Sequence, residues 1–201
     1  VGDVKKVRSP VRTLTSLEAR SLFTALRKAA NHPLLLRVRY TKEDDLRLIS
    51  QAALTSGYFG NQCDIAKVRE EIESSSDLDI HRICSSMPSI LGHLALSGDT
   101  LYESPKTRYL KDALPRLYME GHRILLFSQW TMILDILELV CEDIDMNFLR
   151  LDGSTPIRER QRMIDKFNAP ESSVIGSSES IPIFLLSTKA GGLGINLTAA
   201  D

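Results

Sequence analysis

The residues with the clearest chemical potential lie at positions 187–201, where a polar start runs into a glycine-rich stretch. This stretch contains Ser187, Thr188, Lys189, Gly191, Gly192 and Gly194. Hydroxyl, ammonium and backbone N–H groups suit phosphate oxygens, and glycine lets the main chain approach a ligand closely. The pattern therefore indicates contact with a nucleotide or with a nucleic-acid backbone. A simple turn between a strand and a helix is the alternative, because glycine strings alone are weak motifs.

Two other polar turns also follow apolar runs that predict buried strands. Ser128 and Gln129 follow the run at residues 124–127, and the turn that starts at Asp152 follows a second run. The glycine-rich stretch follows a third, at residues 181–186. In open parallel sheets, ligands bind outside the carboxyl ends of the strands. We therefore expect the three turns to meet at one edge of a sheet and to form a single site.

The second half of the chain supplies the helices that such a sheet needs. Helical patterns occupy residues 106–119, 132–141 and 155–167. In the last of these, Thr155 is the expected N-cap and Pro156 the first helical residue, with Ile157, Ile164 and Phe167 facing the core. Strands that alternate with helices at this spacing predict a parallel sheet with right-handed crossovers. The fold class is therefore α/β.

Residues 14–103 are predicted to be mostly helical, without strand–helix alternation. Thr15 and Glu18 form a plausible capping box for a first helix that ends at Pro33. Its apolar residues, Leu22, Phe23, Leu26 and Ala30, fall on one face. Further helices are expected after Asp64 and after Ser76 or Asp77. We accordingly divide the chain into residues 1–103, a helical segment, and residues 104–201, a partial α/β lobe.

Composition restricts the class of protein. The chain has 201 residues, 43% of them hydrophobic, and a formal net charge of −1, so any contact with nucleic acid must come from local clusters. The basic run Lys5–Arg8 is one candidate, although a solvated tail explains it as well. Three scattered cysteines indicate neither a zinc site nor a disulfide framework. We expect no membrane span, and the start without Met suggests a piece of a longer protein.

Several blocks resemble the motifs of the Swi/Snf-type chromatin-remodelling ATPases of helicase superfamily two. The run Thr188 to Leu197 resembles the fifth helicase motif. In the order expected for that family, the matching blocks are Asn31-His32-Pro33, Phe127-Ser128-Gln129-Trp130, and Leu149 to Thr155 with Glu159-Arg160-Gln161. Ser104-Pro105-Lys106 echoes the Ser-Gly-Lys start of the second lobe, and its proline puts the local turn in doubt. Asn31 to Arg37 and Asp79 to Cys84 resemble the SMARCAD/ETL-like subfamily in particular.

The resemblance implies a RecA-like helicase C-terminal lobe of the P-loop NTPase type, preceded by a helical inter-lobe segment. Such a lobe closes on ATP and Mg²⁺ that are held mainly by a first RecA-like lobe. In this reading DNA backbone contacts fall on Ser128, Gln129, Ser187, Thr188 and Lys189. Residues next to the nucleotide are Gly191, Gly192, Gly194 and Asp201. The partners implied are double-stranded DNA, nucleosomes with their histones, and the first lobe, in the nucleus.

The chain itself is expected to be catalytically inactive. It has no Gly-x-x-x-x-Gly-Lys-[Ser/Thr] phosphate loop and no Asp-Glu box, and the sixth motif would follow Asp201. No catalytic or metal-binding residue is therefore assigned to it. Asn31 and His32 are interpreted as a helix end and not as a catalytic pair, while Arg158 and Arg160 suit either phosphate contact or surface ion pairs.

Two alternative functions stay open. The first is a related DNA-dependent translocase that acts in DNA repair or transcription. The second is a non-catalytic module that binds a small nucleotide with the same strand-end loops.

Overall fold

A computed structural model describes residues 15–169, 180–191 and 194–201. The basic run Lys5–Arg8, the loop at residues 170–179, and Gly192 lie outside these residues. The first half is helical. Its elements are α1 (Ser16–Asn31), the 3₁₀ turn η1 (Pro33–Leu35), α2 (Glu43–Thr55), α3 (Ile65–Ser74), α4 (Asp77–Ser86), α5 (Pro88–Leu91), and the 3₁₀ turns η2 (Gly92–Leu94) and η3 (Gly98–Tyr102).

The helix starts in this half follow from local capping chemistry. The Thr15 side chain accepts from the Glu18 N–H while the Glu18 carboxylate accepts from the Thr15 N–H, as the predicted capping box requires. Asp64 caps α3, and Ser76 with Asp79 forms a second capping box at the start of α4. The expected helix starts at Thr15, Asp64 and Ser76 are thus confirmed.

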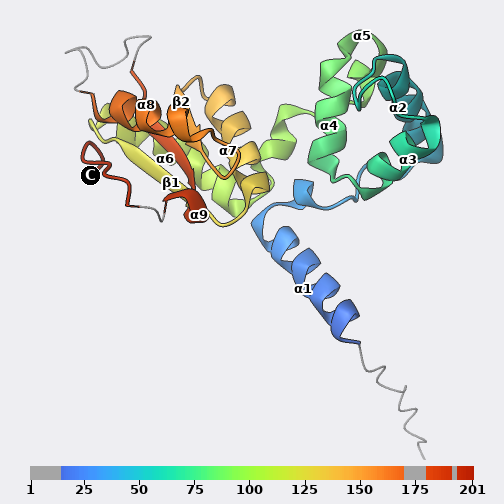
Figure 1. Cartoon of the computed structure of the whole chain (residues 1–201), viewed down its shortest axis with the longest axis horizontal. Helices are drawn as coiled ribbons and strands as arrows, with labels where there is room; N and C mark the ends of the chain where they lie inside the picture. The colour runs from blue at the N-terminus through green and yellow to red at the C-terminus, as the bar shows by residue number, and fades with distance from the viewer. Residues whose placement is uncertain (1–14, 170–179, 192–193) are drawn as a thin grey trace, which may run out of the picture.

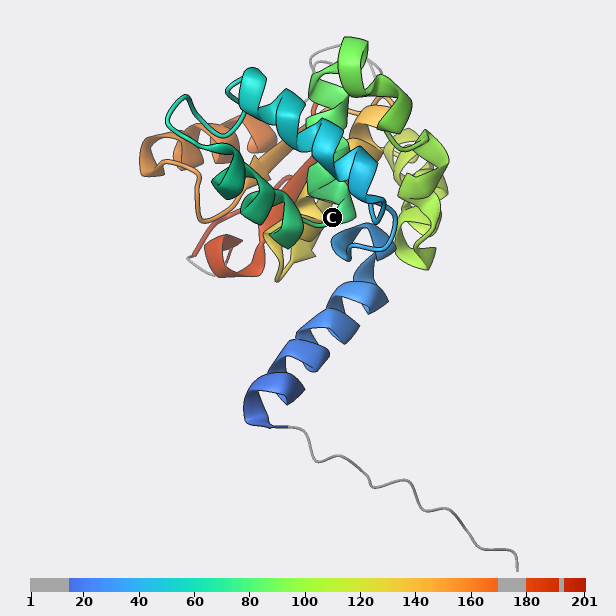
Figure 2. The ribbon, with the colours of Figure 1, turned by 90° about the vertical axis from the view of Figure 1, so that its right-hand side faces the viewer.

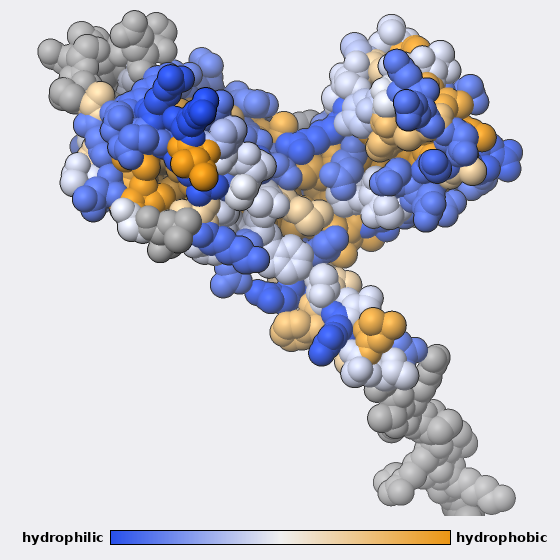
Figure 3. All heavy atoms as spheres, in the orientation of Figure 1, coloured by the Kyte–Doolittle hydropathy of each residue, from blue (hydrophilic) through white to orange (hydrophobic). Residues whose placement is uncertain are grey.

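Helix α1 departs from its expected packing. It projects away from the rest of the chain, as Figures 1 and 2 show, and none of its residues is buried. Leu22, Phe23 and Leu26, which the periodicity assigns to a core-facing side, are 49%, 63% and 58% exposed. The apolar residues of this helix are visible as orange spheres among polar ones in Figure 3. Amphipathic periodicity correctly predicts a helix here, but the described chain provides no surface that covers its apolar face.

The second half contains a parallel sheet with helices on both faces (Figure 1). Its elements are α6 (Pro105–Met119), β1 (Ile124–Ser128), α7 (Thr131–Asp143), β2 (Phe148–Leu151), α8 (Ile157–Asn168), β3 (Ile183–Ser187) and the short α9 (Thr188–Gly191). The strand order is β1-β3-β2, so the last strand inserts between the first two. Each predicted strand is confirmed within one or two residues of its expected bounds.

Two details at the start of α8 differ from the sequence prediction. The N-cap is Pro156 and the helix begins at Ile157, one residue later than expected. The Thr155 hydroxyl accepts instead from the Asp152 N–H and so closes the preceding turn. Ile157, predicted to be buried, is 85% exposed, whereas Phe167 at the other end of the helix is fully buried. The residues of α8 that pack in the apolar cluster on the sheet lie further along the helix, at Ile164 and Phe167, so periodicity overestimates the burial of Ile157.

Three apolar clusters hold the described residues together. One packs α2, α3 and α4 of the helical segment, and another packs α8 on the sheet face that carries Phe184. The largest cluster joins the two halves, because Leu34, Leu78 and Leu101 pack with Leu134 and Leu137 of α7. Within the described residues, no helix is both long and apolar enough to cross a bilayer.

Candidate nucleic-acid interface

The three polar turns meet at one edge of the sheet, as the sequence predicts. The strands are parallel, and the register pairs Ser128 at the end of β1 with Ser187 at the end of β3. On the other side of β3, Leu151 pairs with Leu186, which places Asp152 next to Ser187. Polar residues that are far apart in the sequence therefore leave the sheet side by side. We call this place the strand-end edge.

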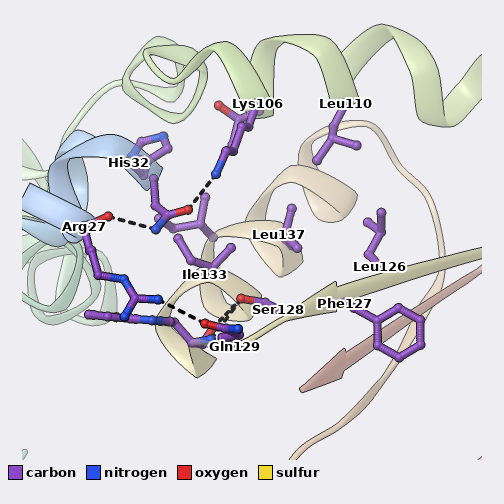
Figure 4. Close-up of a pocket in the computed structure, with 14 residues that line it drawn as sticks. Arg27, His32, Lys106, Leu110, Leu126, Phe127, Ser128, Gln129, Ile133 and Leu137 are labelled. Atoms are coloured by element: carbon purple, nitrogen blue, oxygen red, sulfur yellow. Dashed lines mark hydrogen bonds between the residues drawn. The ribbon is translucent and has the colours of Figure 1, made fainter. Parts of the chain in front are cut away.

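In the turn after β1, the Ser128 side chain stabilises the turn. The Ser128 hydroxyl donates to the Trp130 carbonyl at 2.9 Å and accepts from the Trp130 N–H at 3.1 Å. Gln129 is exposed, and its Oε1 accepts from Arg27 Nη2 at 3.1 Å, while the Arg27 guanidinium lies 5.6 Å from the centre of the Trp130 ring. This contact joins α1 to the strand-end edge across 102 positions of sequence (Figure 4). The Phe127 ring ends an apolar run that predicts a buried strand, but it is 54% exposed.

In the turn after β2, Asp152 anchors the backbone. Its carboxylate accepts from the Ser154 N–H at 2.8 Å and from the Ser154 hydroxyl, and Arg150 donates to its other oxygen. Burial alone would raise the pKa of Asp152, but the hydrogen bonds from Ser154 and Arg150 hold the pKa below its ordinary value. Arg160 donates to the carbonyls of Asp152 and Thr155. This arginine therefore stabilises the turn, a role that the sequence did not suggest.

At the end of β3, the three predicted contact residues differ in access. Ser187 is buried, and its hydroxyl accepts from the Ala190 N–H at 3.2 Å, so it caps the first turn of α9. Thr188 and Lys189 are exposed. Beyond them, Gly191 ends α9, and the exposed Gly194 has φ +65°, a conformation that glycine adopts at little cost. Of the three predicted contact residues at this strand end, Thr188 and Lys189 are thus the two that a ligand reaches.

Asp201 lies beside the beginning of β1, at the opposite end of that strand from Ser128. Its carboxylate accepts from His122 Nδ1 at 2.9 Å and from the Arg123 N–H at 3.3 Å. The bonds from His122 and Arg123 lower the pKa of this carboxyl. The structure therefore does not bring Asp201 together with Lys189. Among the described residues, no group of three or more His, Cys, Asp or Glu side chains is placed to hold a metal ion.

Asn31 and His32 have structural hydrogen bonds. His32 is 1% exposed, its Nδ1 accepts from the Leu34 N–H at 3.1 Å, and its Nε2 donates to the Leu101 carbonyl at 2.9 Å. Asn31 bonds the Arg27 carbonyl and Lys106 Nζ. These bonds tie the end of α1 to η3 and α6, in agreement with the interpretation of this pair as a helix end.

Sequence reasoning missed Arg27 and the ion-pair network around Arg150. Arg27 follows no local pattern, and its partners Gln129 and Trp130 are known only from the tertiary structure. The sequence singles out Lys106 only as part of Ser104-Pro105-Lys106. The proline does not disturb that turn, because Pro105 takes the first helical position and the Ser104 hydroxyl caps the helix by accepting from the Lys106 N–H.

Comparisons with known proteins identify related chains. Residues 105–201 match the family model of the helicase conserved C-terminal domain. Protein CHROMATIN REMODELING 19 of Arabidopsis thaliana is 40% identical over 197 residues, which cover 98% of this chain and 25% of that protein. ATP-dependent helicase FUN30 of Saccharomyces cerevisiae is 36% identical over 201 residues, which cover all of this chain and 17% of that protein.

A human protein and a solved structure extend the comparison. The SWI/SNF-related matrix-associated actin-dependent regulator of chromatin subfamily A containing DEAD/H box 1 of Homo sapiens is 41% identical, over all of this chain and 19% of that protein. The crystal structure of the C-terminal part of the Fun30 ATPase domain superposes with a TM-score of 0.75 at 35% identity, covering 94% of this chain and 60% of that one. The chain thus spans a quarter or less of the length of these three curated relatives.

Proposed function

The chain belongs to the SWI/SNF-related family of helicase C-terminal domains, in its FUN30- and SMARCAD1-like branch, and from that premise we propose that it is the DNA-binding second motor lobe of an ATP-dependent chromatin remodeller. In this proposal the strand-end edge binds the phosphate backbone of duplex DNA. The lobe closes on ATP that a first RecA-like lobe holds, and each closure moves the duplex without separating its strands. We assign residues 1–103 to the inter-lobe segment and residues 104–201 to the lobe.

The register of the sheet carries this proposal. It aligns the ends of β1, β3 and β2, so that Gln129, Thr188 and Lys189 leave neighbouring strands at one exposed edge. Hydroxyl, amide and ammonium groups bind phosphate oxygens without reading bases, which suits a motor that moves along any DNA sequence. Ser128 and Ser187 contribute as turn caps that fix this geometry.

The described residues of this chain fit ATP only in part, and they do not fit Mg²⁺. Gly191 and Gly194 offer backbone that a phosphate or the opposing lobe can approach, and ATP bound between the lobes supplies the free energy of closure. The Asp201 carboxylate is engaged by His122 and Arg123, and the described residues provide no cluster of metal ligands. Mg²⁺ therefore belongs with the first lobe in this proposal, and no step of it runs through the metal on this chain.

Replacement of the exposed lysine tests the role in DNA binding. Lys189→Ala is expected to weaken retention of a short DNA duplex several-fold and to lower the salt dependence of binding by about one counterion, because one phosphate contact is lost. The matched control is Lys67→Ala, an exposed lysine on α3. Fluorescence anisotropy at several salt concentrations measures both quantities. Loss of nucleotide binding with unchanged DNA binding would favour the nucleotide-binding module instead.

A second experiment addresses catalysis. Residues 1–201 alone are expected to show no DNA-stimulated ATP hydrolysis, because the chain has no phosphate loop. Joining it to the first lobe and the remaining motor segments of a relative should restore hydrolysis. Substantial turnover by the isolated chain would contradict the assignment.

The choice between chromatin remodelling and the runner-up depends on the substrate. The names of the relatives favour chromatin, and on that basis we place the protein in the nucleus with nucleosomes as partners. A nucleosome-sliding assay on the complete protein makes the distinction. DNA translocation without histone movement would favour a translocase of DNA repair or transcription.

A further inference from the structure

A cavity of about 350 Å³ opens beside the strand-end edge. It lies between the end of α1, the start of α6 and the end of β1, and Figure 4 shows the residues around it. Its inner wall is apolar, with Leu110, Leu126 and Leu137 among the lining residues, and Arg27 and Lys106 also line it. Neither Asp nor Glu occurs among the residues that line this cavity. The charged side chains that line it, Arg27 and Lys106, are therefore both positive.

Both cations are held in place by neutral partners. Arg27 Nη2 donates to Gln129 Oε1 at 3.1 Å, and Lys106 Nζ donates to Asn31 Oδ1 at 2.7 Å. The Asn31 amide in turn donates to the Arg27 carbonyl at 2.8 Å. A neutral amide orients a cation without cancelling its charge, whereas an aspartate or glutamate would do both. Arg150, in contrast, is surrounded by three carboxylates.

The position of Lys106 in its helix is electrostatically unfavourable. It lies in the first turn of α6, a 15-residue helix that has no acidic residue in that turn. The N-terminal end of a helix carries partial positive charge and favours anions, so a lysine there opposes the helix dipole. Departures from such local rules are expected at functional sites. The combined positive charge of Arg27, Lys106 and the helix end would be relieved by a bound anion.

We infer that Arg27 and Lys106 form a phosphate subsite that extends the strand-end edge toward α1 and takes a second phosphate of the DNA backbone. This inference rests on the proposed function and adds two residues to it. Gln129 connects the two parts, because it follows β1 at the edge and bonds Arg27 directly. Arg27 and Lys106 are both exposed and accessible to a duplex. A backbone with regularly spaced phosphates reaches both parts of the edge at once, which a mononucleotide does not.

The salt dependence of DNA binding distinguishes a phosphate contact from a purely structural role. Arg27→Ala and Lys106→Ala are each expected to reduce affinity for a short duplex several-fold. Each should also reduce the slope of log K against log salt by about one, equally for two unrelated duplex sequences. Lys67→Ala on α3 is the control, and far-UV circular dichroism verifies that each variant is folded.

Arg27→Lys gives the sharper test. This variant keeps the charge but loses the planar fork that contacts Gln129 and Trp130. A phosphate subsite predicts that Arg27→Lys retains the salt slope of the wild type. If Arg27 only supports the turn after β1, Arg27→Lys will lose as much affinity as Arg27→Ala, and all slopes will equal that of the wild type, which would overturn the inference.

The outcomes separate this inference from the proposed function. If the wild-type chain retains DNA and Lys189→Ala weakens retention, while the Arg27 and Lys106 variants behave as wild type, the subsite is wrong and the proposed function stands. A wild-type chain that retains no duplex even at about 50 mM salt would overturn both.

Discussion

Arg150 is the centre of an ion-pair network with three carboxylates. Its Nη1 lies 2.7 Å from Asp135 and 2.8 Å from Glu138, and its Nη2 lies 2.8 Å from Asp152. All four side chains are less than a quarter exposed. The network joins α7 to β2 and to the turn that forms part of the strand-end edge. Only Asp152 is fully buried, but the other three side chains are largely shielded from water, so removal of the shared cation leaves partly desolvated carboxylates and is costly.

Arg150→Met is therefore expected to lower the free energy of unfolding by about 3 kcal/mol. Three carboxylates would lose their shared cation while the volume of the side chain is nearly kept. Arg47→Met is the control, because Arg47 and Glu43 form an exposed pair within α2 whose removal should cost less than about 0.5 kcal/mol. Urea denaturation of both variants measures the difference. Equal midpoints would refute a stabilising role for the network.

His32 gives the chain a predictable dependence on pH. Burial lowers the pKa of His32, although its hydrogen bond to the Leu101 carbonyl and the nearby Glu103 act in the opposite direction. The unfolded chain binds this proton near pH 6.5, above the pKa in the folded state. The unfolded state then holds more protons below that pH, so stability falls as the pH drops from about 6.5 toward 5. Burial also lowers the pKa of His81 and adds to the effect.

His32→Gln should reduce this loss of stability between about pH 6.5 and 5, because one of the two histidines whose pKa is lowered no longer titrates. The quantity to compare is the slope of unfolding free energy against pH, since the substitution also changes packing. His93→Gln, at an exposed histidine, serves as the control. If His32→Gln and the wild type show the same slope of unfolding free energy against pH, His32 has the same pKa in the folded and the unfolded state, which would contradict this prediction.

At the scale of elements, α1 is the helix whose environment most needs explanation. Its capping box and its end at Pro33 are local features, and they form as expected. Its apolar residues Leu22, Phe23 and Leu26 stay exposed and belong to none of the three apolar clusters. The link from α1 to the edge runs through Arg27 at its C-terminal end, so the N-terminal turns extend freely.

Leu26→Ser is expected to change the unfolding free energy by less than about 0.5 kcal/mol, because an exposed leucine contributes little burial. Leu34→Ala, only eight positions along but 2% exposed, should cost about 2–5 kcal/mol. Thermal or urea denaturation compares them. A cost for Leu26→Ser as large as that for Leu34→Ala would mean that α1 packs against the body in solution.

At the scale of the whole molecule, the two halves share a core. Leu34, Leu78 and Leu101 of the helical segment pack into the same cluster as Leu134 and Leu137 of the α/β lobe. Arg82 of α4 adds polar contacts to Asp135 and Glu138 of α7. The proposed division near residue 104 thus separates two patterns of secondary structure that are joined by continuous packing.

Because of this shared core, we expect one cooperative unfolding transition. Fluorescence of Trp130, the one tryptophan of the chain, reports the lobe, and far-UV circular dichroism is dominated by helices of both halves. The two urea curves should coincide, and Leu78→Ala should shift both to lower urea together. A fluorescence midpoint that stays in place while the ellipticity midpoint moves would indicate that the halves unfold independently.

The sequence by itself determined the local structure and the membership of the family. Caps at Thr15, Asp64 and Ser76, the three strands and the turn chemistry after each strand depend on residues within a few positions of one another. Parallel pairing also follows from strand–helix alternation, and this is why the convergence of Ser128, Asp152 and Ser187 was predictable. Each motif block is contiguous in the sequence, so its resemblance to a family can also be recognised without the structure.

Only the tertiary structure decided the strand order β1-β3-β2, the exposure of α1 and Ile157, and the partners of Arg27 and Arg150. Periodicity tells which side of a helix is apolar but not whether anything covers it. A side-chain contact such as that of Arg27 with Gln129 joins residues 102 positions apart, and its energy depends on where the backbone brings them. Such long-range contacts leave no local pattern in the sequence, because any exposed arginine looks the same until the chain has folded.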